Sequence, residues 1–291
     1  MWVVRSLIRR LADRFATTVA SRVVRILHER TDRSDAQYAA LAVLRDRYPA
    51  FAGLTGSELR VFSQNGEDGV IAEIFARIGA PTRTFVEFGV GAGTECNTRL
   101  LAEVLGWSGV YFEPDPVAFP ALAARYEHRP DVVTVNAAIT PATVDEQFAA
   151  AGVAAEPDLC SIDVDGSDYW IWRALTRFRP RVVVIEVNAA LPPDERWAQP
   201  EDAPPWDETD AFGASLGALR ALGADKGYRL VHWDMTGVNA CFVRDDLADA
   251  FPDAAGTPRT GVVRLLRGDL DAHHAGRRCH RRLRRGSRAE G

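Results

Sequence analysis

The sequence lacks the features that mark membrane-spanning, secreted and nucleic-acid-binding proteins. No apolar run in its 291 residues approaches the roughly 20 that a membrane-spanning helix needs. Arginines interrupt the apolar positions near the start, so no secretory signal is expected there. The net charge is −5, which argues against general affinity for nucleic acids and predicts no specific nucleic-acid partner.

Cysteine and lysine are also scarce. The four cysteines show neither a Cys-x-x-Cys pair nor the Cys/His spacing of a metal site; they are Cys96, Cys160, Cys241 and Cys279. Free thiols in a reducing cytosol are therefore expected, which predicts a cytoplasmic protein. Lysine occurs only at Lys226 while arginine, alanine and aspartate are frequent, a bias that suggests a GC-rich bacterial genome. A chain that is 47% hydrophobic and 26% charged is long enough for one sizeable core with attachments.

The most informative stretch begins at residues 84–88, whose β-branched and aromatic side chains predict a buried strand. Gly89, Gly91 and Gly93 follow at alternate positions, where a ligand could approach the backbone closely. Residues 99–106 then have helical periodicity and end in glycine. A strand, a glycine-rich turn and a helix form the first unit of a nucleotide-binding α/β fold.

The glycine spacing indicates which nucleotide is bound. A dinucleotide fingerprint needs G-x-G-x-x-G, and Thr94 stands where its third glycine would be. Glu87 lies two positions before the first glycine, and this acidic-x-Gly-x-Gly-x-Gly pattern resembles motif I of Rossmann-like methyltransferases that bind S-adenosylmethionine. The Glu87 carboxylate could steady the cationic methionine end of such a cofactor, directly or through water. The alternative is a bare tight turn in another α/β protein.

Polar residues follow the later predicted strands as well. Glu113 ends a strand at 109–113, about 20 positions beyond the turn, where the ribose hydroxyls of an adenosine cofactor would lie. Asn136 ends a strand at 131–136, near the expected position of the adenine. Ser63 or Asn65 can cap a helix at 68–78, but capping does not explain Gln64, so this segment could instead fold over the cofactor.

Acidic residues gather after the fourth and fifth predicted strands. Asp163 ends the strand at 158–163, and Asp165 and Asp168 follow it within five residues. Such carboxylates are costly to bury without cations or donors, so they belong at the open carboxyl edge of the sheet. A neighbouring strand at 181–186 would bring Glu186 and Asn188 to the same edge.

The two ends of the chain differ from its middle. Residues 1–30 have apolar side chains at helical spacing with arginines mostly off that face, which predicts an amphipathic helix. This helix could lie on the inner membrane surface, or it could pack on the catalytic domain or on a second copy in a dimer. We predict a helical extension at 1–55, a catalytic domain at 56–245, and a basic, disordered tail at 246–291.

Four segments together resemble the FkbM-type methyltransferases, a family with the Rossmann-like (class I) fold. They cover parts of residues 56–245 and are SQNGEDG (63–69), VEFGVGAG (86–93) with Asn97 and Thr98, FEPDP (112–116) and SIDVDGSDYW (161–170). The resemblance implies an α/β three-layer sandwich with a seven-stranded, mostly parallel sheet in the order 3-2-1-4-5-7-6, with the N-terminal helices outside it. Asp165 and Asp168 stand where the family often has glutamates.

The resemblance also implies S-adenosylmethionine as cofactor and a set of residues that bind it. These are Gln64, Glu87, Gly89, Gly91, Gly93, Asn97, Glu113, Asn136 and Asp163. The implied reaction is methyl transfer to a hydroxyl of a sugar, glycan or natural-product acceptor. Asp163 or Asp165 is the first candidate for the base that removes the hydroxyl proton, and His232 is the second.

Three alternatives remain open at this point. Hard oxygen ligands on Asp163, Asp165, Glu186 and Asn188 would suit Mg²⁺, although no dense ligand spacing requires a metal and none is predicted. A nicotinamide-dependent oxidoreductase would also use Glu113, but it needs the glycine that Thr94 replaces. A non-catalytic scaffold could keep the cofactor fold, but it would not need the acidic residues at the sheet edge.

Overall fold

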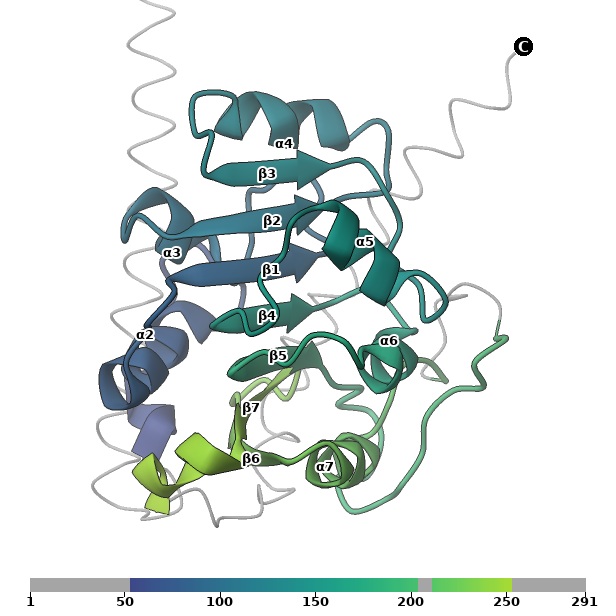
Figure 1. Ribbon diagram of the computed structural model, residues 1–291. Helices are drawn as coiled ribbons and strands as arrows, with labels where there is room; N and C mark the ends of the chain where they lie inside the picture. Colours follow the sequence, from purple (N-terminus) through teal and green to yellow (C-terminus); the bar gives the residue numbers. More distant parts are fainter. Residues whose placement is uncertain (1–52, 204–210, 253–291) are drawn as a thin grey trace, which may run out of the picture. The chain divides into compact units, whose positions relative to one another are not determined.

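The computed structural model describes residues 53–203 and 211–252, drawn in colour in Figure 1. The chain divides into two compact units, residues 1–49 and 50–291, and every described residue belongs to the second. The helix predicted at 1–30, nearly all of the helical extension predicted at 1–55, and the basic tail from residue 253 onward lie outside the described residues. None of the helices in the described part has both the length and the apolar character that crossing a bilayer requires.

The described residues form one seven-stranded sheet in the order β3-β2-β1-β4-β5-β7-β6 (Figure 1). Neighbours from β3 to β5 run parallel, whereas β7 is antiparallel to both β5 and β6. The strands are β1 (Thr84–Phe88), β2 (Ser108–Phe112), β3 (Val132–Val135), β4 (Leu159–Ile162), β5 (Val182–Glu186), β6 (Tyr228–Trp233) and β7 (Asn239–Arg244). The predicted fold class and strand order are therefore confirmed.

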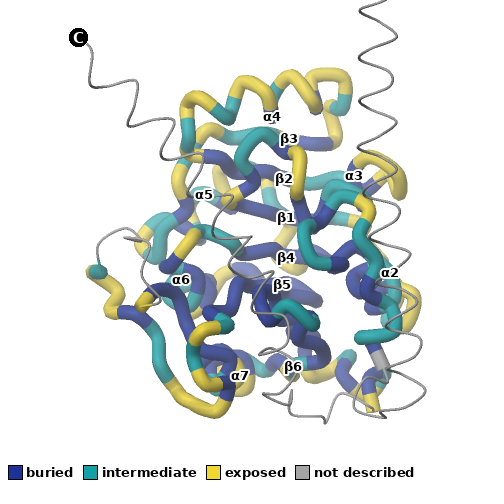
Figure 2. The backbone as a smooth tube through the Cα atoms, turned by 180° about the vertical axis from the view of Figure 1, so that it is seen from behind, coloured by how far each residue is buried: buried dark blue, intermediate teal, exposed yellow. Residues whose placement is uncertain are grey.

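Helices cover both faces of this sheet, which gives the expected three layers (Figures 1 and 2). On one face pack α2 (Glu67–Ile78), α3 (Arg99–Glu103) and α4 (Phe119–Tyr126). On the other face pack α5 (Val144–Ala150), α6 (Asp168–Ala174) and α7 (Leu216–Asp225). Two short 3₁₀ helices, η2 (Gly53–Ser57) and η3 (Asp245–Ala250), flank the described fold.

The central strands are mostly apolar because both of their faces are covered by helices. Every residue of β4 and β5 is buried, as the dark blue strands of Figure 2 show. Side chains alternate between the two layers along β1, where Phe85 packs with α2 and α3 while Val86 and Phe88 pack with the opposite helices. Near-continuous apolar runs are the sequence pattern of buried parallel strands.

The start of α2 differs from the prediction. Gly66, in a left-handed conformation at φ 101°, is its N-cap in place of Ser63 or Asn65. The Ser63 hydroxyl still accepts the backbone N–H of Asp68 at 3.1 Å. In return, Asp68 Oδ2 accepts the three backbone N–H groups of residues 61–63 at 2.7–2.9 Å. Asp68 therefore fixes the segment that leads into α2, which lies beside the site described below.

The packed fold extends a few residues beyond the domain end predicted at residue 245. The 3₁₀ helix η3 follows β7 directly, and Phe251 behind it is 2% exposed within the core layer of α2 and α3. The residues from 246 to 252 are therefore part of the folded domain.

A buried ion pair fixes the opposite, amino-terminal edge of the sheet. Arg181 Nη1 donates to Asp158 Oδ1 at 2.6 Å, and Asp158 Oδ2 accepts the backbone N–H groups of Thr82 and Arg83. We predict that Asp158→Ala lowers the free energy of unfolding by about 3–5 kcal/mol, because it leaves the buried Arg181 guanidinium without a counter-charge. Urea denaturation monitored by circular dichroism measures this loss.

An exposed ion pair provides the control for that measurement. Asp131 pairs with Arg129 at 2.7 Å near the start of β3, where both side chains are about a third exposed. Asp131→Ala should therefore cost no more than about 1 kcal/mol. Equal losses in the two variants would show that the Asp158–Arg181 pair has no special structural role.

Candidate active site

A cavity of about 200 Å³ opens at the carboxyl ends of β1 and β4. Its walls come from the end of β1 and the turn after it, the residue following β4, the segment before α2 and the first residue of β7. The lining residues are Gln64, Glu87, Phe88, Gly89, Glu95, Asn97, Asp163 and Asn239. Ligands of open α/β sheets bind at this carboxyl edge.

The three glycines of the turn have different structural roles. All three have positive φ, at 84° for Gly89, 56° for Gly91 and 71° for Gly93. A Cβ on Gly89 would lie 1.6 Å from the carbonyl oxygen of Asp163, and a Cβ on Gly93 would lie 2.8 Å from Leu122. A Cβ on Gly91 would meet nothing within 4 Å. Protein contacts thus explain two of the glycines, and only Gly91 leaves open space at which a ligand could approach the backbone.

Glu87 joins β1 to the start of α3. Its Oε1 accepts the backbone N–H of Asn97 at 2.8 Å, and its Oε2 accepts the backbone N–H and the hydroxyl of Thr98 at 3.0 and 2.5 Å. Burial raises the pKa of Glu87 to about 7, against these hydrogen bonds, which lower it. The carboxyl group therefore holds the turn in place while it also forms part of the cavity wall.

The structure brings five of the nine predicted cofactor residues to the cavity, namely Gln64, Glu87, Gly89, Asn97 and Asp163. Gly91 and Gly93, the other turn glycines, are not part of its wall.

Glu113 and Asn136 form a separate group beside the turn. Glu113 Oε2 accepts the Gly91 N–H at 2.5 Å and its Oε1 accepts the Asp115 N–H at 2.7 Å, while Asn136 Nδ2 donates to the Glu113 carbonyl oxygen at 2.7 Å. Both side chains thus brace the loops around the turn, and their predicted contacts with ribose and adenine stay predictions.

Sequence reasoning missed three of the lining residues, the apolar Phe88 and the polar Glu95 and Asn239. Glu95 lies within the turn itself and is exposed. Asn239 begins β7 and is 4% exposed; its Nδ2 donates to Glu67 Oε1 at 2.7 Å. The signal in the sequence was a polar residue at the start of an apolar strand. This signal identifies a cavity residue only in combination with the strand order. Because β7 runs antiparallel beside β5, the first residue of β7 lies at the carboxyl edge of the sheet.

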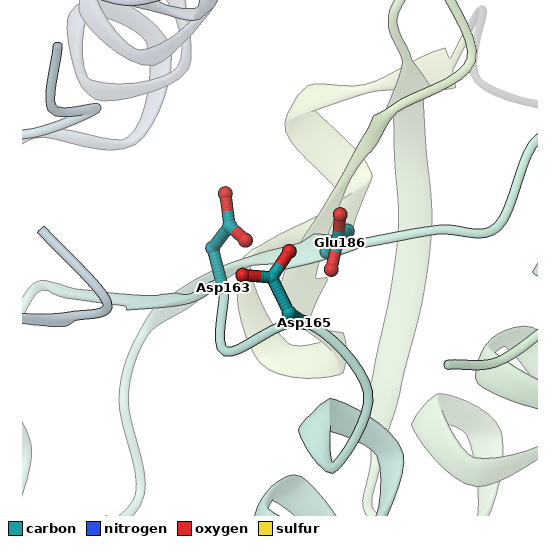
Figure 3. A group of neighbouring side chains, drawn as sticks. All are labelled: Asp163, Asp165 and Glu186. Carbon is teal, nitrogen blue, oxygen red and sulfur yellow. The ribbon is translucent and has the colours of Figure 1, made fainter. Parts of the chain in front are cut away.

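Three carboxylates gather where β4 and β5 end, as Figure 3 shows, and one of them, Asp163, also lines the cavity. Asp163, Asp165 and Glu186 each offer an oxygen atom within 4.8 Å of the other two. The predicted convergence of the β4 and β5 ends is thus observed. Asn188, the fourth residue of the predicted set, donates its side-chain amide to the Phe212 carbonyl and accepts the Ala190 N–H.

The loop that carries Asp165 is shaped by Asp168. The two oxygens of Asp168 accept the backbone N–H groups of Val164 and Gly166 at 2.8 and 2.9 Å. Asp165 between them is exposed and has a left-handed backbone at φ 59°, which an aspartate tolerates better than most residues. Asp168 therefore has a structural role beneath the loop, and Asp165 is presented at its surface.

His232 does not line the cavity. It lies in β6 at 7% exposure, with its Nε2 3.0 Å from Glu58 Oε1. Burial lowers the pKa of His232 to about 4 and raises the pKa of Glu58 to about 8, so at neutral pH the contact joins two uncharged groups. This position favours the structural interpretation of His232 over the catalytic one.

The buried Glu58 predicts a pH dependence of stability. Burial raises the pKa of Glu58 from its ordinary value of 4.5 to about 8 in the folded protein. The contribution of Glu58 to the free energy of unfolding is therefore complete below about pH 4.5 and is lost as the pH rises through about 8. Glu58→Gln keeps the shape of the side chain without this titration. Between pH 5 and 8 the wild type should lose up to about 4 kcal/mol of unfolding free energy relative to the variant, in parallel urea titrations.

An exposed control tests whether the difference comes from Glu58. The buried acids Glu67 and Asp234 lie near Glu58, and both are still present in the Glu58→Gln variant, so they do not account for a difference between the two proteins. Glu146→Gln makes the same chemical change at an exposed position of α5, so its profile should follow the wild type. Parallel profiles for all three proteins would mean that Glu58 titrates normally.

Comparison with known proteins gives no relative in sequence: no family model matches the chain, and no curated protein matches it. Solved structures resemble it weakly. One is the magnesium protoporphyrin IX methyltransferase from Synechocystis PCC 6803 with bound SAM, at 14% identity and a TM-score of 0.39, covering 61% of this chain and 77% of that one.

Two further structures are similar at the same level. The N-terminal domain of EvdMO1, with SAH and D-fucose, is 14% identical with a TM-score of 0.40, covering 61% of this chain and 80% of that one. Monomeric WbdD is 17% identical with a TM-score of 0.39, covering 67% of this chain and 45% of that one. The fold assignment does not depend on these likenesses, because the strand order and directions of the sheet establish it.

Proposed function

We propose that this protein transfers a methyl group from S-adenosylmethionine to a hydroxyl group of a sugar, glycan or natural-product acceptor. One observation carries the proposal. The cavity lies at the carboxyl end of β1, in a sheet of the order 3-2-1-4-5-7-6, and is lined by residues of the glycine-rich motif that follows β1.

The lining residues fit the amino-acid end of that cofactor. Gln64 and Asn97 offer amide N–H groups that can donate to a carboxylate, and Glu87 offers a carboxyl group that can accept from an ammonium. The cavity is smaller than the roughly 300–1,000 Å³ of pockets that enclose a whole ligand, so it accounts for this end only. The nucleoside end would follow the open space beside Gly91 towards Glu113.

The bound cofactor supplies a methyl group already activated by its sulfonium. The protein must then orient the acceptor hydroxyl, exclude water and remove one proton. Asp163 is the candidate base, because it is half-buried, lines the cavity and belongs to the cluster that opens toward solvent. Asp165 is the alternative base, at the exposed end of that cluster.

Calorimetric titration with S-adenosylhomocysteine and with NAD tests the proposal. We expect S-adenosylhomocysteine to bind and NAD not to bind, because Thr94 replaces the glycine that a pyrophosphate cradle needs. Binding of NAD alone would indicate an oxidoreductase. Binding of neither ligand would favour a scaffold that retains the fold without the reaction.

A further inference from the structure

We propose that Asp163, Asp165 and Glu186 bind one divalent cation that prefers oxygen ligands, such as Mg²⁺ or Mn²⁺, with Asn239 as a neutral oxygen on the inner side of the site. The three carboxylates come from two neighbouring parallel strands. Asp163 and Asp165 lie in the loop after β4, and Glu186 is the last residue of β5 (Figure 3).

The spacing of the carboxylates suits such an ion. Oxygen ligands about 2.1 Å from Mg²⁺ lie about 3 Å apart when adjacent and about 4 Å apart when opposite. One oxygen from each carboxylate lies within 4.8 Å of the other two, so small side-chain rotations bring the oxygens to these separations. Asp165 is exposed and Asp163 half-buried, so both can move, while burial fixes Glu186 as the anchor. Carboxylate oxygens are the ligands that Mg²⁺ and Mn²⁺ prefer.

The graded burial of the three residues also provides an entry path. Asp165 lies at the surface, Asp163 lies at the cavity wall, and Glu186 is 5% exposed. An ion arriving from solvent would thus meet Asp165 first and Glu186 last.

Asn239 gives an independent indication that a ligand belongs here. It pairs directly with Glu186 in the antiparallel ladder of β5 and β7, so both side chains project from the same face of the sheet. Its Nδ2 donates to Glu67, which orients the amide, and within the described part of the chain its buried Oδ1 has no hydrogen-bond donor. A buried acceptor that receives no hydrogen bond destabilises the fold. A cation, or a water molecule bound to one, would satisfy it.

Cation binding in this site does not depend on methyl transfer. Only the role of the ion rests on the proposed function: it would lie beside the cofactor cavity, where it could hold the acceptor hydroxyl. A titration with Mn²⁺ in the absence of cofactor therefore tests the site alone, and a separate titration with S-adenosylhomocysteine tests the methyltransferase assignment.

The experiment follows free Mn²⁺ by electron paramagnetic resonance as it is added to the full chain. We expect one Mn²⁺ per chain, displaced by Mg²⁺. Asp165→Asn and Glu186→Gln should each weaken binding by about tenfold or more, because each removes a charged ligand, and Asn239→Ala by about threefold. Glu95→Gln removes a charge from the same cavity outside the cluster, and it should change binding by less than about twofold.

Asp165→Asn is the decisive variant because its folding is not in question. The residue is exposed, and asparagine is among the residues that best tolerate its left-handed backbone. Wild-type protein without saturable Mn²⁺ binding, or an Asp165→Asn variant that binds as the wild type does, would overturn the proposal. Equal weakening by Glu95→Gln would also overturn it, since binding would then reflect only the general negative charge of the cavity. Unchanged binding by Asn239→Ala would remove Asn239 from the site.

Discussion

Gly89→Ala should lower the free energy of unfolding by about 4 kcal/mol or more. The new methyl group would lie 1.6 Å from the carbonyl oxygen of Asp163, a distance that only a backbone displacement can relieve. The substitution also puts a side chain on a residue with φ 84°. For a domain of this size such a loss corresponds to a fall of roughly 10 °C in Tm, which thermal unfolding would measure.

Gly152→Ala separates the two causes of that loss. Gly152 follows α5 with φ 73°, and a Cβ there would meet nothing within 4 Å. It therefore carries the same conformational strain without the contact, and it should cost about 1 kcal/mol. Similar losses of unfolding free energy in the two variants would mean that the backbone at Asp163 moves away at little cost. Contact with Asp163 would then not explain the glycine at position 89.

The sheet could be predicted from the sequence because its strands carry their own signals. β1 has the predicted bounds, β2, β3 and β4 each differ by one residue at both ends, and β5 differs by one residue at its start. Runs of β-branched and aromatic residues between glycine and proline breaks specify buried strands locally. Among the helices, α3 was less accurate, since it ends at Glu103 and not at residue 106. The bounds of α2 differ from the prediction by one residue, but a glycine and the contacts of Asp68 with residues 61–63 replaced the expected side-chain cap.

The convergence of Asp163, Asp165 and Glu186 could also be predicted, because parallel neighbouring strands end at the same edge. The structural role of Gly89 could not, since its contact with Asp163 joins residues 74 positions apart in the sequence. The motif predicts that all three glycines make room for the ligand. The folded structure shows that protein atoms fill the space beside Gly89 and Gly93 and leave it open only beside Gly91.

Polar residues gave the least reliable predictions. His232 lies one residue before the end of β6, and sequence alone does not show that Glu58 lies against it. Asn239 was missed because no motif marks it. Its place in the site follows from its pairing with Glu186 across the antiparallel strands and from a buried amide oxygen that receives no hydrogen bond from the described residues. Whether a buried polar group is satisfied depends on all the elements around it, so it is a property of the tertiary structure.

Asp163→Asn should reduce kcat by about 10² to 10⁴-fold while changing the affinity for S-adenosylhomocysteine little. Asparagine keeps the size of the side chain and one oxygen acceptor in the cavity wall, but it cannot take a proton from a hydroxyl. Formation of S-adenosylhomocysteine with an acceptor that the wild type methylates measures kcat, and calorimetry measures the affinity. Glu146→Gln, at an exposed position of α5 outside the cavity, should retain most of the activity.

Excess Mn²⁺ then distinguishes the two roles that the structure allows for Asp163. As a base, its loss cannot be compensated by a metal ion, so the Asp163→Asn variant should stay inactive at any Mn²⁺ concentration. As a ligand, it is one of three, and Asp165 and Glu186 remain to hold a more weakly bound ion, so saturating Mn²⁺ should restore much of the activity. An Asp163→Asn variant that is fully active without added metal would exclude both roles.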